Sequence, residues 1–170
     1  MKNLVLLFAF ILTGFSSTAQ SKLGTIDAEY ILTQMPEMKT VNDSLQVYGE
    51  NMQAELEASI SEYESLVKEY QEKSSTYTED MKKAKEDSII SIENDIKGFR
   101  QKASVMMQMK RNELTQPLYD KINTAMLAVI KEDGYTQIFH AGGNALAYSS
   151  AENDITAKVM QKLGLEIPAE

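Results

Sequence analysis

The chain has 170 residues, of which 25% are charged and 43% hydrophobic, and its formal net charge is -8. This length and composition are typical of a single ordered, water-soluble domain. A chain this acidic lacks the basic stripe that phosphate neutralisation requires, which argues against nucleic-acid binding. The sequence also has no cysteine, which excludes a disulfide framework and a cysteine-linked lipid anchor.

The N-terminus has the pattern of a secretory signal peptide. Lys2 precedes an apolar run over residues 4–15 (LVLLFAFILTGF), and the small residues Ser17 and Ala19 follow it. The run is about a dozen residues long, whereas a helix that spans a bilayer needs roughly twenty. We therefore expect cleavage after Ala19, which removes residues 1–19 and with them Lys2, so that the formal charge falls from -8 to -9. The mature chain would have no transmembrane segment and would be free in an extracytoplasmic compartment, most simply a bacterial periplasm.

A short strand is predicted at residues 23–27 (LGTID), and a long helix follows it. Pro36 suits a first helical turn, because its missing N–H costs nothing there, and it pushes Met35 out of the α region. Apolar side chains then recur in nine steps over 32 residues, which is the period of a helix with one narrow apolar seam. The seam residues are Met38, Val41, Leu45, Tyr48, Met52, Leu56, Ile60, Tyr63, Val67 and Tyr70.

Residues 73–80 (KSSTYTED) are a polar, hydroxyl-rich break that predicts the tip of a helical hairpin. Thr78 is placed to cap a second helix, whose first turn holds Glu79 and Asp80. The seam of that helix comprises Ile89, Ile92, Ile96, Phe99, Ala103 and Met106, and then, less regularly, Leu114, Leu118, Ile122, Met126 and Val129. The two helices are expected to pack against each other along these seams.

Three residues interrupt the helical pattern and are predicted hinge positions: Gly49, Gly98 and Pro117. Glycine lowers local helix stability by about 1 kcal/mol. Pro117 frees the carbonyl of Glu113 and should kink the helix near the end of the arm.

Charge favours antiparallel pairing of the two helices within one chain. Residues 37–72 carry two basic and nine acidic side chains, whereas residues 73–131 carry eleven basic and eight acidic ones. The helices therefore attract each other, and the first helix repels its own copies. Each exposed pair contributes only a few tenths of a kcal/mol, so the seam must supply most of the stability. A solvated charged face with no role in pairing remains an open alternative.

The C-terminal residues have a different pattern. Strands are predicted at residues 135–140 (YTQIFH) and 145–148 (ALAY), joined by turn-forming residues 142–144 (GGN). Residue 153 or 154 caps a final helix that ends at Gly164. The apolar residues of that helix are Ile155, Val159, Met160 and Leu163.

The fold class is therefore α+β, with the antiparallel hairpin of residues 37–131 inserted into a small β-rich body. The body comprises residues 20–36 and 132–170, about sixty residues with three short strands and open sheet edges, which is little for independent stability. We expect several chains to associate through it. The residues expected to form this oligomer body are Ile26, Ile138, Phe139, Leu146, Tyr148, Ile155 and Val159.

Two terminal segments carry a family resemblance, KLGTIDAEYIL at residues 22–32 and NALAYSSAENDITAKVMQKLG at residues 144–164. Together with the long charged hairpin they resemble the Skp/OmpH family of periplasmic chaperones for outer-membrane proteins. The resemblance implies a homotrimer, with a central barrel built from strands of three chains and with coiled-coil hairpins around a cavity. Unfolded outer-membrane proteins would be held soluble there without ATP, and no cofactor or metal is implied. Well-known members are basic and this chain is acidic, so lipopolysaccharide binding is not carried over.

Holding unfolded chains requires adaptable apolar surface on the arms. Met106, Met107 and Met109 are flexible and polarizable, and they are too closely spaced for one seam, so at least one must leave it. We hypothesise that these methionines contact clients, together with Tyr48, Tyr63, Tyr70, Tyr77 and Phe99. The alternative is that these side chains pack the hairpin, and it is favoured for Tyr63, Tyr70 and Phe99.

The sequence does not predict an enzyme. The single histidine, His140, lies in a strand pattern without a cysteine or second histidine to complete a metal site, which favours a structural role. One alternative to a chaperone is a coiled-coil spacer or adaptor of the cell envelope, which would not keep diverse denatured barrels soluble. Another is a protein that sequesters cationic ligands, whose binding would depend strongly on salt.

Overall fold

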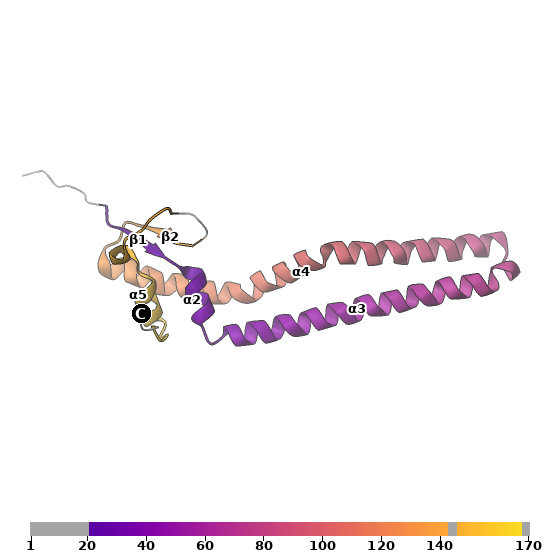
Figure 1. Ribbon diagram of the computed structural model, residues 1–170, viewed down its shortest axis with the longest axis horizontal. Helices are drawn as coiled ribbons and strands as arrows, with labels where there is room; N and C mark the ends of the chain where they lie inside the picture. The colour runs from indigo at the N-terminus through magenta and orange to yellow at the C-terminus, as the bar shows by residue number, and fades with distance from the viewer. Residues whose placement is uncertain (1–20, 143–145, 168–170) are drawn as a thin grey trace, which may run out of the picture. The chain divides into compact units, whose positions relative to one another are not determined.

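The structure is a computed structural model that describes residues 21–142 and 146–167. These residues form two compact units, Tyr30–Asn123 and the segments on either side of it. The predicted signal peptide and residues 143–145 of the predicted turn and strand lie outside the described residues. In chain order the elements are β1 (Leu23–Ile26), α2 (Ala28–Gln34), α3 (Met38–Lys73), η1 (Ser74–Thr76), α4 (Glu79–Asp133), β2 (Gln137–His140), η2 (Ala151–Asn153) and α5 (Thr156–Lys162). Figure 1 labels the strands and the α-helices.

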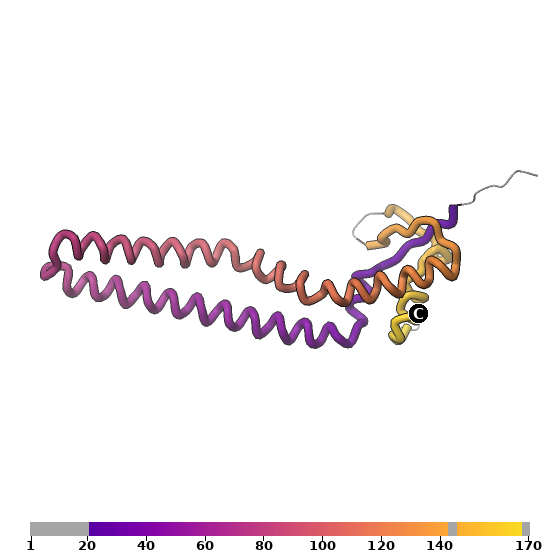
Figure 2. Tube along the Cα trace, turned by 180° about the vertical axis from the view of Figure 1, so that it is seen from behind, coloured from indigo at the N-terminus to yellow at the C-terminus, as the bar shows by residue number. Residues whose placement is uncertain are grey.

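Within the unit Tyr30–Asn123, α3 and α4 lie side by side and run in opposite directions (Figure 2). Three contacts give their register. Lys121 Nζ lies 2.9 Å from Glu37 Oε1, Lys110 Nζ lies 5.9 Å from the centroid of the Tyr48 ring, and Lys85 Nζ lies 2.9 Å from Glu69 Oε2. The two residue numbers of each contact add to between 154 and 158, so the pairing keeps one register along the hairpin.

The predicted apolar seams lie between the helices. Met38, Val41 and Met52 of α3 are buried, and the other predicted seam residues of α3 are half-buried. On α4, Ile96, Leu118 and Ile122 are buried. Both seams are thus confirmed, and the many half-buried positions show that a two-helix contact covers only one side of each seam residue.

The helix ends follow local sequence signals. The Thr78 hydroxyl accepts a hydrogen bond from the N–H of Met81 at 3.3 Å, and an Asp154 carboxylate oxygen accepts one from the N–H of Thr156 at 2.8 Å. Gly164 follows α5 with a φ of 71°, the left-handed conformation in which glycine ends helices most easily. Gly134, with a φ of 72°, ends α4 in the same way and was not anticipated from the sequence.

Helix α4 continues through Pro117, which is exposed. The neighbouring Thr115 is buried, and its hydroxyl donates to the carbonyl of Arg111 at 2.9 Å. Pro117 has no N–H to donate to the preceding turn, and the Thr115 hydroxyl competes for a carbonyl of that turn. Helical hydrogen bonding is therefore weaker in this segment.

The second unit is organised around a parallel strand pair. In this pair Leu23 of β1 is in register with Gln137 of β2, and Ile26 is in register with His140. The other edge of β1 makes a single bridge, from Thr25 to Asp154. A Cβ added at Gly24 would lie 2.7 Å from Ile138 Cδ1 and 2.9 Å from a ring carbon of Tyr135, so a larger residue there would require these side chains to shift. The apolar core of this unit comprises Ile26, Val129, Tyr135, Ile155, Val159 and Met160.

The predicted third strand is wrong for its described residues 146–148, which form no strand. The expected β-rich body is instead a pair of four-residue strands that pack with helical segments. The physical reason is pairing. A strand forms only where a neighbour supplies a hydrogen-bonded edge. Within the described residues β1 pairs with β2 along one edge and bridges Asp154 along the other, and residues 146–148 form no ladder with the free edge of β2.

Candidate functional site

The three arm methionines lie in different environments. Met106 and Met107 are half-buried. The sulfur of Met107 would lie 3.9 Å from a Cβ added at Gly49, so Met107 packs toward α3 where the glycine leaves room. Met109 is 66% exposed, and it is the one of the three that leaves the seam. Val105 is also exposed and lies one turn away from Met109. Val105 was not among the predicted site residues, although the helical spacing of the seam could have revealed it.

The predicted aromatic residues lie mostly within the hairpin. Tyr63, Tyr70, Tyr77 and Phe99 are half-buried. The ring of Tyr48, also half-buried, lies under the ammonium of Lys110 at a distance that permits a cation–π contact. These rings therefore pack the arm, and the parts of them that remain accessible are smaller than that of Met109.

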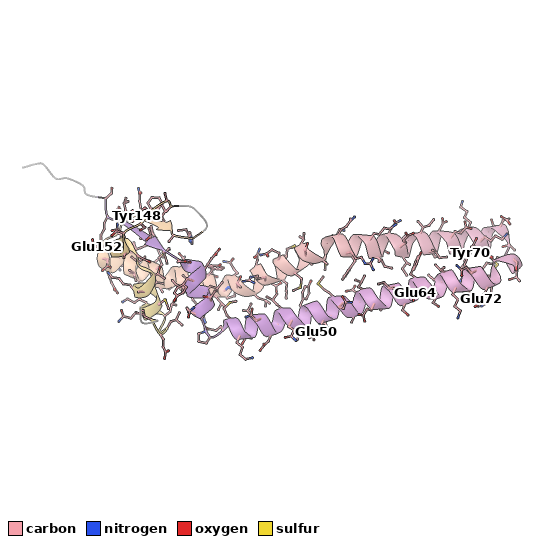
Figure 3. The ribbon with its side chains drawn as sticks, viewed as in Figure 1. Glu50, Glu64, Tyr70, Glu72, Tyr148 and Glu152 are labelled. Carbon is pink, nitrogen blue, oxygen red and sulfur yellow. The ribbon has the colours of Figure 1, made fainter. Side chains whose placement is uncertain are left out.

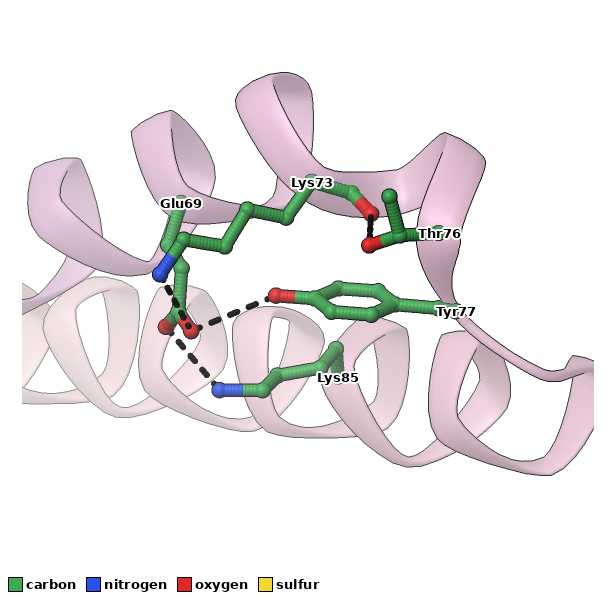
Figure 4. Close-up of polar contacts among 5 residues, drawn as sticks. All are labelled: Glu69, Lys73, Thr76, Tyr77 and Lys85. Carbon is green, nitrogen blue, oxygen red and sulfur yellow. Dashed lines mark hydrogen bonds and ion pairs between the residues drawn. The ribbon is translucent and has the colours of Figure 1, made fainter.

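The tip is joined by a polar cluster around one carboxylate (Figure 4). Glu69 accepts hydrogen bonds from Lys85 at 2.9 Å and from the Tyr77 hydroxyl at 3.2 Å, and Lys73 lies 3.7 Å from the same carboxylate. The hydrogen bond from Lys85 lowers the pKa of Glu69, and it raises the pKa of Lys85. The cluster connects α3, the loop and the start of α4, so it holds the tip closed and fixes the register there.

A second tyrosine adds to the tip. The Tyr70 hydroxyl donates to Glu86 on α4, which raises the pKa of Tyr70, and the ring centroids of Tyr70 and Tyr77 lie 6.4 Å apart. Both hydroxyls are thus used within the hairpin. The structure gives these two tyrosines a packing role, in line with the alternative favoured for Tyr70.

The residues expected to form the oligomer body divide into two groups. Ile26, Ile155 and Val159 are buried in the core of a single chain. Ile138 and Leu146 are half-buried, and Phe139 and Tyr148 are 43% and 84% exposed. Tyr148 is labelled in Figure 3.

Three residues of the second group, Phe139, Leu146 and Tyr148, lie around a shallow apolar pocket of about 260 Å³. Leu23, Gly24, Thr25, Phe139, Leu146 and Tyr148 line it, together with Ser149, Ser150 and Asn153. Leu23 is 45% exposed, and it was not among the residues predicted to form the oligomer body. Large apolar side chains that gather around a pocket beside a sheet edge are typical of an interaction surface.

Ion pairs hold α5 to the end of α4 within this unit. Lys162 Nζ lies 2.7 Å from Glu132 Oε1, and Lys158 bonds to Asp133. The bond from Lys158 lowers the pKa of Asp133 and is accompanied by a raised pKa of Lys158. These exposed pairs orient the helix, while the buried Val159 and Met160 provide most of its packing energy.

The described residues present no assembled metal site. His140 ends β2 with an exposed side chain. Among residues 21–142 and 146–167 there is no group of His, Asp or Glu side chains arranged to hold a metal ion. Nor does any helix within this part of the chain combine the length and apolar character needed to cross a bilayer.

Comparison with known proteins decides the family. The family model described as "Outer membrane protein (OmpH-like)" matches residues 22–163, which is most of the chain. The chain belongs to this family. Among its members, the chaperone protein Skp of Yersinia enterocolitica is 26% identical over 159 residues, covering 89% of this chain and 92% of that protein. The chaperone protein Skp of Pectobacterium atrosepticum is 24% identical over 155 residues, covering 87% of this chain and 88% of that protein.

The fold also matches a solved structure. The crystal structure of an OmpH-like protein from Caulobacter crescentus superposes with a TM-score of 0.61 at 16% identity, and the match covers 88% of each chain. At that identity the match bears on the fold alone. The mostly helical chain with long helices and a small strand pair is therefore the OmpH-like fold.

Proposed function

We propose that this protein is an ATP-independent periplasmic holdase that keeps unfolded outer-membrane proteins soluble. The observation that carries the proposal is a long hairpin with adaptable apolar side chains left exposed on it, in a chain whose relatives are named chaperones. Met109 and Val105 are 66% and 57% exposed on α4. Single exposed apolar side chains are common on soluble proteins, but these two stand one turn apart on the arm, where together they offer the kind of adaptable surface that a holdase uses for its clients.

Each individual contact between the proposed client surface and a client is expected to be weak. Besides the exposed pair, we include the half-buried Met106 and Met107 and the accessible edges of Tyr63, Tyr70, Tyr77 and Phe99. Each contact contributes little, and affinity arises when several arms contact one unfolded chain. Weak and dispersed binding suits a client that must later leave without ATP.

The proposed assembly surface is the pocket beside the strand pair. Leu23, Phe139 and Tyr148 expose apolar area there, and β2 has no second strand partner within the described residues. A second copy that paired this edge and covered the pocket would complete the sheet. We propose a homotrimer with a shared barrel, supported by the family. The buried Ile26, Ile155 and Val159 would support the interface from within each chain.

The remaining parts of the proposal concern export and motion. Cleavage after Ala19 would release residues 20–170 into the periplasm. Residues 20–36 and 132–170 would serve as the assembly body, and residues 37–131, with the tip near 73–80, as the arm. Gly49, Gly98 and Pro117 would let the arm bend around clients of different size.

Aggregation suppression tests the proposal directly. A urea-denatured outer-membrane barrel protein is diluted into buffer that contains the mature chain. Light scattering is followed while the ratio of chain to client is varied. The proposal expects scattering to vanish near a stoichiometric ratio without nucleotide. A spacer or adaptor of the cell envelope, the second candidate, would leave the scattering of diverse denatured barrels unchanged.

A further inference from the structure

The two helices of the hairpin carry opposite charge at the same height, that is, at the same position along the hairpin axis. Between Lys39 and Lys68, α3 has six acidic residues and no basic one. Between Asp95 and Glu113, α4 has five basic residues and no acidic one. Because residue numbers across the hairpin add to between 154 and 158, the basic segment lies opposite the middle of the acidic run.

Most of these charges make no ion pair with another described residue, although Glu50 and Glu57 each accept a hydrogen bond from a glutamine one turn earlier. Arg100, Lys102 and Arg111 are exposed and form no ion pair with any residue that the structure describes. The same holds, within the described residues, for five exposed carboxylates of α3, of which Figure 3 labels the first and the last. They are Glu50, Glu55, Glu57, Glu62 and Glu64.

The exposed surfaces of the two helices also differ in shape. Small exposed side chains recur along α3 at helical spacing, namely Ala54, Ala58, Ser61 and Ser65. On α4 the exposed Val105 and Met109 are bulky and stand one turn apart. The numbers 47 and 109 add to 156, so at equal height these two side chains lie opposite Val47 of α3, which is 55% exposed, just before the row of small residues begins. The small side chains next to it let two helices approach closely.

We propose that the exposed face of α4 around Arg100–Arg111 docks on the exposed acidic face of α3 in a second copy of this chain. Charge complementarity selects that partner, because α3 repels α3 while attracting the basic segment of α4. The contact joins two different faces, so it repeats from copy to copy, and within the proposed trimer three such contacts close a ring. It rests on the self-association proposed above.

This contact gives the empty assembly a resting state. It covers Val105 and Met109 while no client is present, and an arriving unfolded chain displaces it by burying the same side chains. Because the contact consists of exposed charges, salt weakens it and lets the arms separate. The arms of the empty assembly are then together at low salt and apart at high salt.

The sequence makes a clean cross-linking test available, because the chain contains no cysteine. Ala54→Cys chains and Gln101→Cys chains are refolded together, and a short bismaleimide is added at low salt. Both positions are exposed, and their numbers add to 155, which places them at the same height. The expected product links position 54 of one copy to position 101 of another. Assemblies made from Ala54→Cys chains alone are the matched control and should not cross-link.

Charge reversal tests the cause of the contact. Reversing Arg100, Lys102 and Arg111 to Glu in both cysteine variants should lower the cross-linking yield about tenfold, as expected when three exposed pairs become repulsive. Adding Glu50→Lys, Glu55→Lys and Glu57→Lys should restore it. Since these side chains make no ion pair within the described hairpin, helix content by circular dichroism should stay unchanged.

Sedimentation of the same samples separates the possible failures. A multi-chain mass without the 54–101 product, or with a product that charge reversal leaves unchanged, overturns the arm contact alone. A single-chain mass overturns both the contact and the proposed assembly. Loss of client holding in the reversed variant, without any 54–101 product in the parent, would show that the basic face binds clients and would also overturn the contact.

Discussion

Met109→Ser should weaken client holding without destabilising the arm. Full burial of a methionine side chain contributes about 1.5–3 kcal/mol. Met109 is 66% exposed in the free chain, so a client can bury roughly two thirds of it, which is worth about 1–2 kcal/mol for each copy. A loss of that size weakens one contact by roughly 5- to 30-fold. The exposed position itself should change the free energy of unfolding by less than about 0.5 kcal/mol.

The assay is suppression of light scattering by a denatured outer-membrane barrel. It is run at about 0.5 M salt, where charges separated by more than roughly 4 Å are screened and contacts between arms do not compete. Met109→Leu is the matched control, because it keeps the apolar area and should hold clients as well as the parent. Met107→Ser should behave differently, lowering arm stability because Met107 packs toward Gly49. Unchanged holding by Met109→Ser, at unchanged assembly mass, would refute the assignment of Met109 to the client surface.

Three further predictions concern stability. Ile155→Ala removes a side chain that is 0% exposed, so it should destabilise the strand-bearing unit by about 2–5 kcal/mol. This would be measured as a lower unfolding midpoint in urea. An unchanged midpoint would contradict the place of Ile155 in the core. Pro117→Ala should raise the free energy of arm unfolding by up to about 3 kcal/mol, because it restores the hydrogen bond to the carbonyl four residues earlier. This would be measured as a higher midpoint in urea. A lower midpoint would show that the proline fits its site without cost. The pKa of Glu69, followed by NMR, should lie below its ordinary value and should rise in Lys85→Met. A lowered pKa stabilises the folded state at pH values above the unfolded pKa, so the tip should loosen as pH falls through the folded pKa. A Glu69 titration that the substitution leaves unchanged would contradict the ion pair.

The helical hairpin could be predicted because its signal is repeated over many turns. A seam that recurs at a period near 3.6 places every residue on a face, so the buried Met52 and Ile96 follow from spacing alone. The cap at Thr78 follows from local side-chain chemistry, and Asp154, one residue before the N-cap Ile155, accepts a hydrogen bond from the first N–H of α5. The end of α4 at Gly134 was missed, although a glycine after a long periodic run is itself a stop signal.

The strand-bearing unit was less predictable, since a strand depends on a partner that the local sequence does not name. Residues 146–148 have a strand composition and yet form no strand, whereas β1 and β2, distant in sequence, pair in parallel. For the candidate site, spacing showed that at least one of the three methionines must leave the seam, and it could not say which. The exposure of Met109 and Val105 depends on the register of two helices, which is set by contacts such as that between Met107 and Gly49.

The central claim is that several copies assemble through the strand-bearing unit and leave their arms to hold an unfolded chain. Sedimentation velocity of residues 20–170 at micromolar concentration, alone and after dilution of a denatured outer-membrane barrel into the sample, tests it most directly. The account predicts a defined multi-chain mass that grows by one client without a change in the number of its own copies. A folded single chain, or an assembly from which the client sediments separately as aggregate, would contradict it.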